Sequence, residues 1–283
     1  MVASPPVKRV VASWVCVACV AGCSGAGDGD ATQGDGGGRA QPDASDASDA
    51  SKPSQPCPSG VVDGDYVVET DDDAAAIAGC TEITGDLSVT GDVETVDLSS
   101  LTMVGGSFRI HDTTALDGIE LPALLAVSRD LEVNANAALA TFAAPALEST
   151  NVTGFFDNDA LTDVDISALA DTGFIRLQKN AALPSFSAPL VDELGVFFVS
   201  ENSALVSASF DSLTTITIDG FILTKNAVVT TLDLPVLTNV FGDVLISMNP
   251  MFPACRAEEI RAQIDDPSVP FVAEHNDDSA TCP

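Results

Sequence analysis

The side chains of this sequence best suited to nucleophilic, redox or metal chemistry are seven cysteines and two histidines. A serine or cysteine nucleophile needs a base within hydrogen-bond reach, but neither His111 nor His275 stands near a nucleophile motif. Carboxylates are abundant, with 42 Asp and Glu against 11 Lys and Arg, so any single pair of them indicates little. The sequence therefore predicts no catalytic residues and a protein that is not an enzyme. A β-helical enzyme that acts on polysaccharides is kept as a remote alternative.

The first three cysteines lie in or directly after an export signal. Basic residues at positions 8 and 9 precede an apolar run over residues 10–20, which is typical of a secretory signal and too short for a membrane span. Residues 20–23, Val-Ala-Gly-Cys, resemble a bacterial lipobox, whose Cys is lipidated after cleavage. We therefore expect residues 1–22 to be a lipoprotein signal peptide and Cys23 to anchor the exported protein in the outer membrane or at the cell surface. A simple signal peptide that is cleaved elsewhere is the alternative.

Residues 23–56 have a different composition, rich in Gly, Asp, Ser, Ala and Pro, with almost no apolar side chains. Such a segment cannot bury enough surface to offset the entropy lost on ordering, so it is predicted to be a flexible linker. Its Asp-Gly-Asp pieces raise the question of calcium. They lack the ligand spacing and the closing Glu of an EF-hand loop, so we expect no metal or cofactor, with Ca²⁺ binding as the weaker interpretation.

The other four cysteines flank the middle of the chain, two on each side. Local pairing gives Cys57–Cys80 and Cys255–Cys282, each closing a loop worth about 3 kcal/mol in the chain-entropy model. A four-cysteine zinc site is the alternative, although the spacing offers no close ligand pair. Each pair encloses a short stretch of helical pattern. We therefore expect an N-terminal cap over residues 57–84 and a C-terminal cap over residues 253–283.

Between the caps, over residues 85–252, a motif recurs every 22 to 24 residues. Each copy has two apolar residues in alternation and an Asn three positions after the second, as in Leu131, Val133 and Asn136. A fixed period of this size is typical of a solenoid, in which each coil buries its apolar side against its neighbours. We therefore expect a mainly β, parallel solenoid of about eight coils. The repeated Asn is predicted to be structural, at a corner where stacked side chains pair: Asn136, Asn158, Asn180, Asn202, Asn226 and Asn249.

The positions between the alternating apolar residues should point away from the core. In the first coils these positions are polar, but from about residue 152 onward they become apolar. An apolar patch on a solvent-facing surface usually marks an interface. The alternatives are a loop that covers the patch, or a strand register displaced by one residue, which would exchange the two faces. The candidate interaction patch comprises Val152, Phe156, Phe174, Val196, Phe198, Ile222 and Leu245.

The coil phrase and the flanking motifs resemble a known family. The opening Cys80-Thr-Glu-Ile-Thr-Gly-Asp-Leu and the closing Asn249-Pro-Met-Phe-Pro-Ala-Cys255 are similar to those of bacterial receptor-L-domain-like, leucine-rich-repeat-like surface proteins. The resemblance covers roughly residues 57–283. It implies a right-handed parallel β-solenoid and a location at the cell surface, and it supplies no catalytic residues.

The charge restricts the partners. A formal net charge of −31 disfavours nucleic acid and anionic lipid, so contact with the membrane is expected only through the lipid anchor. These features predict a non-catalytic binding or adhesion module whose partner is a protein or glycan at the cell surface. A passive envelope or spacer protein is the main alternative.

Overall fold

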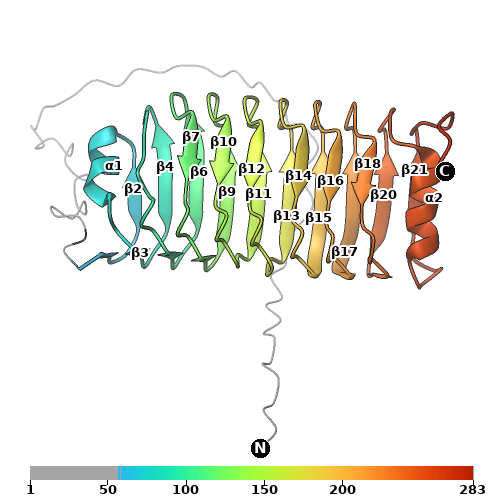
Figure 1. Cartoon of the computed structure of the whole chain (residues 1–283), viewed down its shortest axis with the longest axis horizontal. Helices are drawn as coiled ribbons and strands as arrows, with labels where there is room; N and C mark the ends of the chain where they lie inside the picture. Colours follow the sequence, from blue (N-terminus) through green and yellow to red (C-terminus); the bar gives the residue numbers. More distant parts are fainter. Residues whose placement is uncertain (1–56, 58, 283) are drawn as a thin grey trace, which may run out of the picture. The chain divides into compact units, whose positions relative to one another are not determined.

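The computed structural model describes residues 57 and 59–282. The predicted signal peptide (1–22), Cys23 and the linker up to residue 56 lie outside the described residues. The described part is a parallel β-solenoid whose rungs stack side by side between two short helices (Figure 1). The predictions of a mainly β parallel solenoid and of two terminal disulfides are both confirmed.

One large sheet runs the length of the solenoid, and all its paired strands are parallel. We call it the main sheet. Its strands, in spatial order, are β2 (Tyr66–Val68), β4 (Leu87–Gly91), β6 (Phe108–Thr113), β9 (Asp130–Asn134), β11 (Val152–Phe156), β13 (Phe174–Gln178), β15 (Glu193–Ser200), β17 (Thr215–Thr224), β20 (Asp243–Ser247) and β21 (Phe271–Glu274), with β19 (Asn239–Val240) paired to β17.

Shorter sheets form the other sides of the coils. One consists of β1 (Val61–Val62), β3 (Glu82–Ile83), β5 (Met103–Val104) and β8 (Ala126–Val127). The others are β7 (Gly118–Glu120), β10 (Thr141–Ala143) and β12 (Asp163–Asp165), and β14 (Ser185–Ser187), β16 (Ser207–Ser209) and β18 (Thr231–Asp233). A turn follows each of β7, β10, β14 and β18, and the recurring prolines begin or lie within these turns, where a missing N–H costs no ladder hydrogen bond.

The strand register follows from the alternation in the sequence. Leu131 and Val133 in β9 are fully buried, and so are their partners in the neighbouring rungs. A displacement by one residue would place Asp130, Glu132 and Asn134 in the core, at a cost of several kcal/mol for each buried charge. The apolar columns therefore fix which side of the main sheet faces the core.

The rungs continue into both caps. β2 adds a rung before the first predicted repeat, and β21 adds one after the last. Residues 271–276 repeat the coil pattern: Phe271 and Ala273 pair with the core residues Val244 and Ile246, and Asn276 continues the Asn positions. Each cap therefore contributes a rung to the main sheet as well as covering an end of the core.

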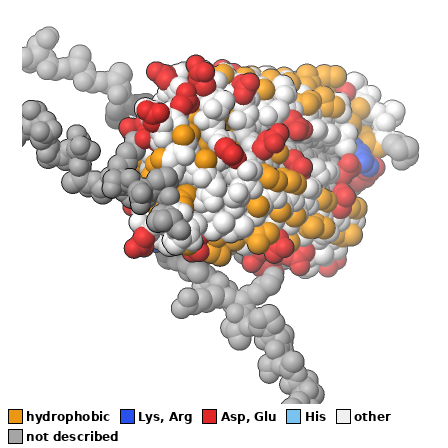
Figure 2. Space-filling model, turned by 60° about the vertical axis from the view of Figure 1, so that its left-hand side comes forward, with side chains coloured by type: hydrophobic (Ala, Val, Ile, Leu, Met, Phe, Trp, Pro, Cys, Tyr) orange, Lys and Arg blue, Asp and Glu red, His pale blue; other side chains and the backbone are white. Residues whose placement is uncertain are grey.

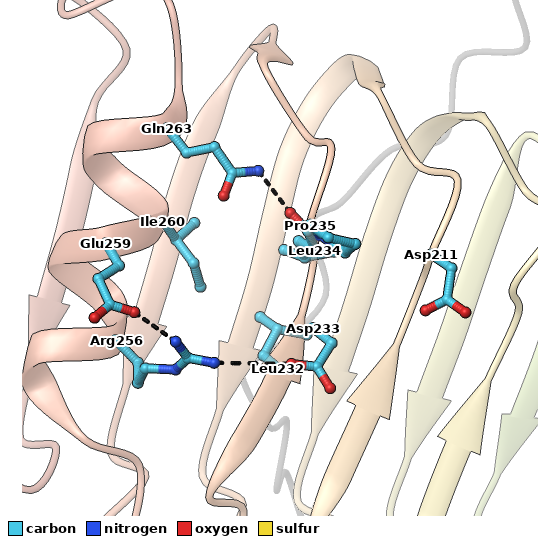
Figure 3. Close-up of a pocket in the computed structure, with 9 residues that line it drawn as sticks. All are labelled: Asp211, Leu232, Asp233, Leu234, Pro235, Arg256, Glu259, Ile260 and Gln263. Atoms are coloured by element: carbon cyan, nitrogen blue, oxygen red, sulfur yellow. Dashed lines mark hydrogen bonds and ion pairs between the residues drawn. The ribbon is translucent and has the colours of Figure 1, made fainter. Parts of the chain in front are cut away.

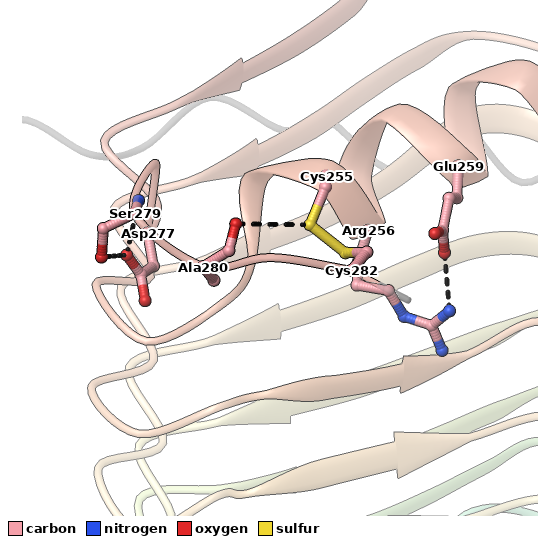
Figure 4. The surroundings of a disulfide bond; sticks show 7 residues. All are labelled: Cys255, Arg256, Glu259, Asp277, Ser279, Ala280 and Cys282. Carbon is pink, nitrogen blue, oxygen red and sulfur yellow. Dashed lines mark hydrogen bonds and ion pairs between the residues drawn. A yellow bond between two sulfur atoms is a disulfide. The ribbon is translucent and has the colours of Figure 1, made fainter.

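The two helices close the ends. α1 (Asp71–Ile77) begins at Thr70, whose side chain accepts a hydrogen bond from the N–H of Asp73 in a capping box. α2 (Ala254–Gln263) buries Ala257 and Ile260 against the last coil. Cys57 and Cys80 hold the N-terminal cap, with their Cα atoms 5.5 Å apart, and Cys255 and Cys282 hold the C-terminal cap at 5.9 Å (Figure 4).

One irregularity interrupts the even coils. Between Leu194 and Val196 of β15 stands one residue, whereas three stand between their partners Ile216 and Gly220 in β17. The extra residues bulge outward and leave Ile218 61% exposed, and Phe241 in the following coil is 59% exposed. Because Gly220 has a φ of +77° and its Cβ position would lie against the backbone of the next coil, only glycine fits there.

Candidate functional site

The outward face of the main sheet carries a row of side chains in strict register from rung to rung. We call it the central row. Its composition changes along the solenoid, from polar on β4, β6 and β9 to apolar on β15, β17, β20 and β21. In order it holds Val67, Ser88, Arg109, Glu132, Gly154, Arg176, Phe198, Ile222, Leu245 and Val272.

The seven predicted patch residues all lie on this outward face. Phe198, Ile222 and Leu245 follow one another in the central row, and Val152, Phe174 and Val196 follow one another in the adjacent row. All seven are partly exposed, while their sequence neighbours on the inward side are buried. The structure thus brings the predicted residues together on β11 to β20, and no described loop covers them completely.

An arginine lies within the patch. The guanidinium of Arg176 lies 4.4 Å from the centre of the Phe156 ring, a cation–π contact. Its Nε donates to Oε1 of Gln178 at 3.1 Å, and a second nitrogen donates to the same oxygen. Gly154 leaves room for the Phe156 ring to lie back over the sheet. The patch therefore presents an apolar surface in which the guanidinium of Arg176 is held against an aromatic ring.

The polar half of the face pairs its own charges. Arg109 bridges Asp86 at 3.3 Å and Glu132 at 3.4 Å. The backbone N–H of Ser107 and the Arg109 guanidinium hold the pKa of Asp86 below its usual range. His111 hydrogen-bonds Ser88 through Nε2 and Asp112 through Nδ1, each at 2.9 Å. These side chains are surface groups with local partners.

The six predicted Asn residues form a continuous buried ladder at the end of the main-sheet strands. Each is fully buried, and the side chain of each contacts the Asn of a neighbouring rung. Thr113 begins the ladder and Asn276 ends it. Because all these hydrogen bonds are made within the protein, the ladder serves the fold and is not available to a ligand.

The residue before each ladder position has a left-handed backbone conformation, with φ between 53° and 60°. We call these residues the corner column. They are exposed or partly exposed. Two ion pairs run along the column, Lys179 with Asp157 at 3.6 Å and Lys225 with Glu201 at 3.9 Å. The corner column is Asp112, Ala135, Asp157, Lys179, Glu201, Lys225, Met248 and His275.

A pocket of about 390 Å³ lies between α2 and the last coil, next to β18 (Figure 3). Gln263 spans it at one end by donating to the backbone oxygens of Leu234 and Leu237 at 2.6 and 2.7 Å. Arg256 spans it at the other end, contacting Asp233 at 3.9 Å and Glu259 at 2.6 Å. Ile260 lines the pocket between these two contacts. Gln263 and Arg256 thus join α2 to the coil that contains β18. Because β18 is the last strand of its short sheet, the helix takes the place of a further strand there.

The described residues contain no group of three or more His, Cys, Asp or Glu side chains that could hold a metal ion. The Asp-Gly-Asp pieces considered for calcium lie outside the described residues. No helix within the described part is long and apolar enough to cross a membrane.

Charge is distributed unevenly around the coils. Between residues 59 and 253 every Lys and Arg lies on a main-sheet strand or directly beside one: Arg109, Arg129, Arg176, Lys179 and Lys225. Acidic side chains are spread over the surface drawn in Figure 2, where basic ones are scarce and hydrophobic ones gather in groups. The outward face of the main sheet is therefore the side on which charges of both signs occur together.

Three features of this surface were not predicted from the sequence. The corner column depends on a backbone angle, which residue types such as Ala135 and Met248 do not indicate. The bulge at Ile218 had a visible signal, because Asn202 and Asn226 are 24 residues apart where the preceding ladder residues are 22 apart. The last rung was hidden by its longer spacing of 27 residues.

No family model matches this chain, and no match was found among curated proteins or solved structures. The similarity to receptor L domains remains a prediction from the sequence motifs.

Proposed function

We propose that this protein is a non-catalytic binding module of the cell surface, anchored by lipid at Cys23, and that it binds through the outward face of β11 to β20. The observation that carries the proposal is the unbroken apolar run of the central row, from Phe198 through Ile222 and Leu245 to Val272. Strands about 4.8 Å apart place these side chains in contact distance of one another. A solvent-facing surface of this kind is typical of an interface.

The charge distribution supports the same face. A partner that approached the other sides of the coils would meet mainly acidic side chains, and among the described ones Asp233 is paired there with Arg256 of the C-terminal cap. On the outward face, Arg176 is stacked on Phe156 and the charges of the corner column are paired. Burial of this face on binding therefore leaves fewer charges without a partner than burial of the other sides of the coils would.

The substitution Ile222→Lys tests the proposal. Ile222 is partly exposed, so the fold should survive, while a charge in the middle of the central row should weaken binding by about 2 kcal/mol, as is typical of a lost hot spot. The measurement is saturable binding of dilute, labelled protein to cell-envelope material. Leu190→Lys is the matched control, because Leu190 is 51% exposed in a turn away from the main sheet.

Two outcomes would contradict the proposal. Equal saturable binding by Ile222→Lys and Leu190→Lys would place the binding surface elsewhere. Absence of saturable binding by the unmodified protein, both to envelope material and to itself, would favour the passive spacer. The lipid anchor has its own test: Cys23→Ser should release the protein from membranes or block its processing, and an unchanged detergent-phase partition of the mature variant would contradict the anchor.

A further inference from the structure

The corner column has an unusual order of side chains. From the N-terminal end it runs acid, alanine, acid, base, acid, base, methionine, histidine. When the column of one copy is placed beside the column of a second copy that runs in the opposite direction, Lys179 of each copy lies opposite Glu201 of the other at the centre. Moving outward, the remaining pairs are Asp157 with Lys225, Ala135 with Met248, and Asp112 with His275.

Every one of these pairs is complementary. Three combine an acid with a base, and the fourth combines two apolar side chains. A histidine can donate a hydrogen bond to a carboxylate whether or not it is protonated. A two-fold interface between identical chains requires this property, because residue i of one copy meets residue j of the other while j meets i. The order of the column satisfies that requirement along its full length.

The sheet keeps the column in register. Its residues are separated by 22 to 27 positions in the sequence, but adjacent rungs are all separated by about 4.8 Å in space. The eight residues therefore span about 34 Å at nearly even intervals. Two reversed columns can then stay opposite one another from end to end, which variable spacing would prevent.

The apolar patch shares the same centre. The two-fold axis implied by the column passes between the levels of Lys179 and Glu201, which end β13 and β15. Phe174 lies on β13 and Val196 and Phe198 lie on β15, with further patch residues on β11 on one side and on β17 and β20 on the other. An axis at this level, parallel to the strands, therefore places Phe174 opposite Val196 and Phe198 opposite Arg176 at the centre of the two faces. Ile222 then lies opposite Gly154, and Leu245 lies opposite Glu132, where the apolar part of one copy meets the polar part of the other.

We propose that the outward face binds a second copy of this chain, with the two solenoids antiparallel and their corner columns side by side. This inference rests on the proposed function, because it names the partner of the same surface. The apolar patch supplies the buried area, and the column selects the antiparallel register, since charge complementarity contributes more to specificity than to affinity. Approach by the other sides would oppose mainly acidic side chains, because the described Lys and Arg residues away from the main sheet are Arg256 and Arg261 of the C-terminal cap.

The size of the face indicates a reversible dimer. A surface about 34 Å long and about 17 Å wide, the length of a five-residue strand, would bury roughly 600 Å² on each copy. The total of roughly 1,200 Å² is at the low end for a specific interface. Dimerisation should therefore depend on protein concentration in the micromolar range.

The experiment uses two complementary variants of the intact protein. The four central charges of the corner column are those of residues 157, 179, 201 and 225. The double variant Lys179→Glu, Lys225→Glu makes all four acidic. The double variant Asp157→Lys, Glu201→Lys makes all four basic. Lys already has the left-handed conformation in two coils, so the second variant should fold. Sedimentation equilibrium should show dimers of the unmodified protein, at least about 10-fold weaker dimerisation of each variant, and recovery when the two variants are mixed.

Three results would overturn the proposal: an unmodified protein that stays monomeric over the micromolar range, variants that dimerise as tightly as the unmodified protein, or a mixture that does not associate. Thermal unfolding of each variant separates misfolding from lost contact. The measurements also distinguish a failure of the proposed dimer from a failure of the proposed binding surface. A monomeric protein whose binding to envelope material is still weakened by Ile222→Lys would retain the proposed function and lose only its proposed partner.

Discussion

Asn158 donates a side-chain hydrogen bond to Oδ1 of Asn180 on the next rung, at 3.2 Å, and a second to the backbone oxygen of Val133 on the preceding rung, at 2.8 Å. The same arrangement recurs along the ladder. These side chains provide hydrogen-bond partners for backbone groups at the corner where the parallel strands end. Among the described residues, no buried side-chain nitrogen or oxygen lacks a partner. The ladder therefore links each coil to the next through polar contacts as well as through the apolar core.

Replacing a central ladder residue should destabilise the solenoid strongly. In Asn180→Ala, the backbone oxygen of Phe155 and the side chain of Asn158 each lose a buried partner. Leaving such groups unsatisfied should lower the free energy of unfolding by about 3 kcal/mol. Urea denaturation measures the effect. The control is Asn239→Ala, whose exposed side chain contacts only its neighbour Thr238, and which should stay within about 0.5 kcal/mol of the unmodified protein.

Loss of the C-terminal disulfide should loosen that end alone. Cys255→Ser with Cys282→Ser opens a loop of 27 residues, worth about 3 kcal/mol in the chain-entropy model. Because solenoid stability is close to a sum of local terms, amide exchange should rise in β20 and β21 and stay unchanged in β9 to β13. The matching change, Cys57→Ser with Cys80→Ser, should affect only the first rungs. Exchange that rises uniformly along the solenoid in either variant would contradict local coupling.

Ala135→Gly should stabilise the protein. Ala135 has a φ of +55°, where an L-residue is strained by roughly 1–2 kcal/mol and glycine is not. After the entropy that glycine loses on folding, a net gain of about 0.5–1 kcal/mol is expected in thermal unfolding. Ala137→Gly is the control, because Ala137 is exposed and has an ordinary φ, so the same change there should destabilise. Equal effects at both positions would exclude strain at the corner.

Ser279→Ala should raise the pKa of Asp277. The Ser279 hydroxyl, at 2.6 Å, and its backbone N–H hold the pKa of Asp277 below 3.8. A carboxyl with a lowered pKa in the folded state contributes stability that is complete above pH 3.8 and is lost as the pH falls through the folded pKa. Carboxyl NMR titration should show the rise in pKa for Asp277, whereas Ser268→Ala should shift only Asp266.

The apolar columns made the fold predictable from the sequence. Positions such as Leu131 and Val133 alternate inside every coil and recur from coil to coil, so that both the strand register and the inward side follow from the pattern. The outward residues, including Phe198 and Ile222, followed from the same alternation. The pairing of four cysteines was predictable because two stand on each side of the repeats.

Features that depend on backbone geometry were not predictable. The two additional residues before Asn226 could have been accommodated at any turn of the coil. Their bulge forms at Ile218 because Gly220 and Gly242 allow the backbones of consecutive coils to approach closely there. The rung at Phe271 is hidden because Ala273, which pairs with Ile246 but is exposed, stands where bulkier residues stand in most coils. The cap helix also lengthens the interval before this rung.

Hydroxyl-radical footprinting of the intact protein, free and bound to saturating cell-envelope material or to its own second copy, tests the binding face most directly. We predict that Phe198, Ile222 and Leu245 become protected on binding, while Leu190 and Val206, which are exposed on other sides of the coil, keep their labelling rates. Protection of Leu190 and Val206 with unchanged labelling of Phe198, Ile222 and Leu245 would contradict the assignment of this face as the binding surface.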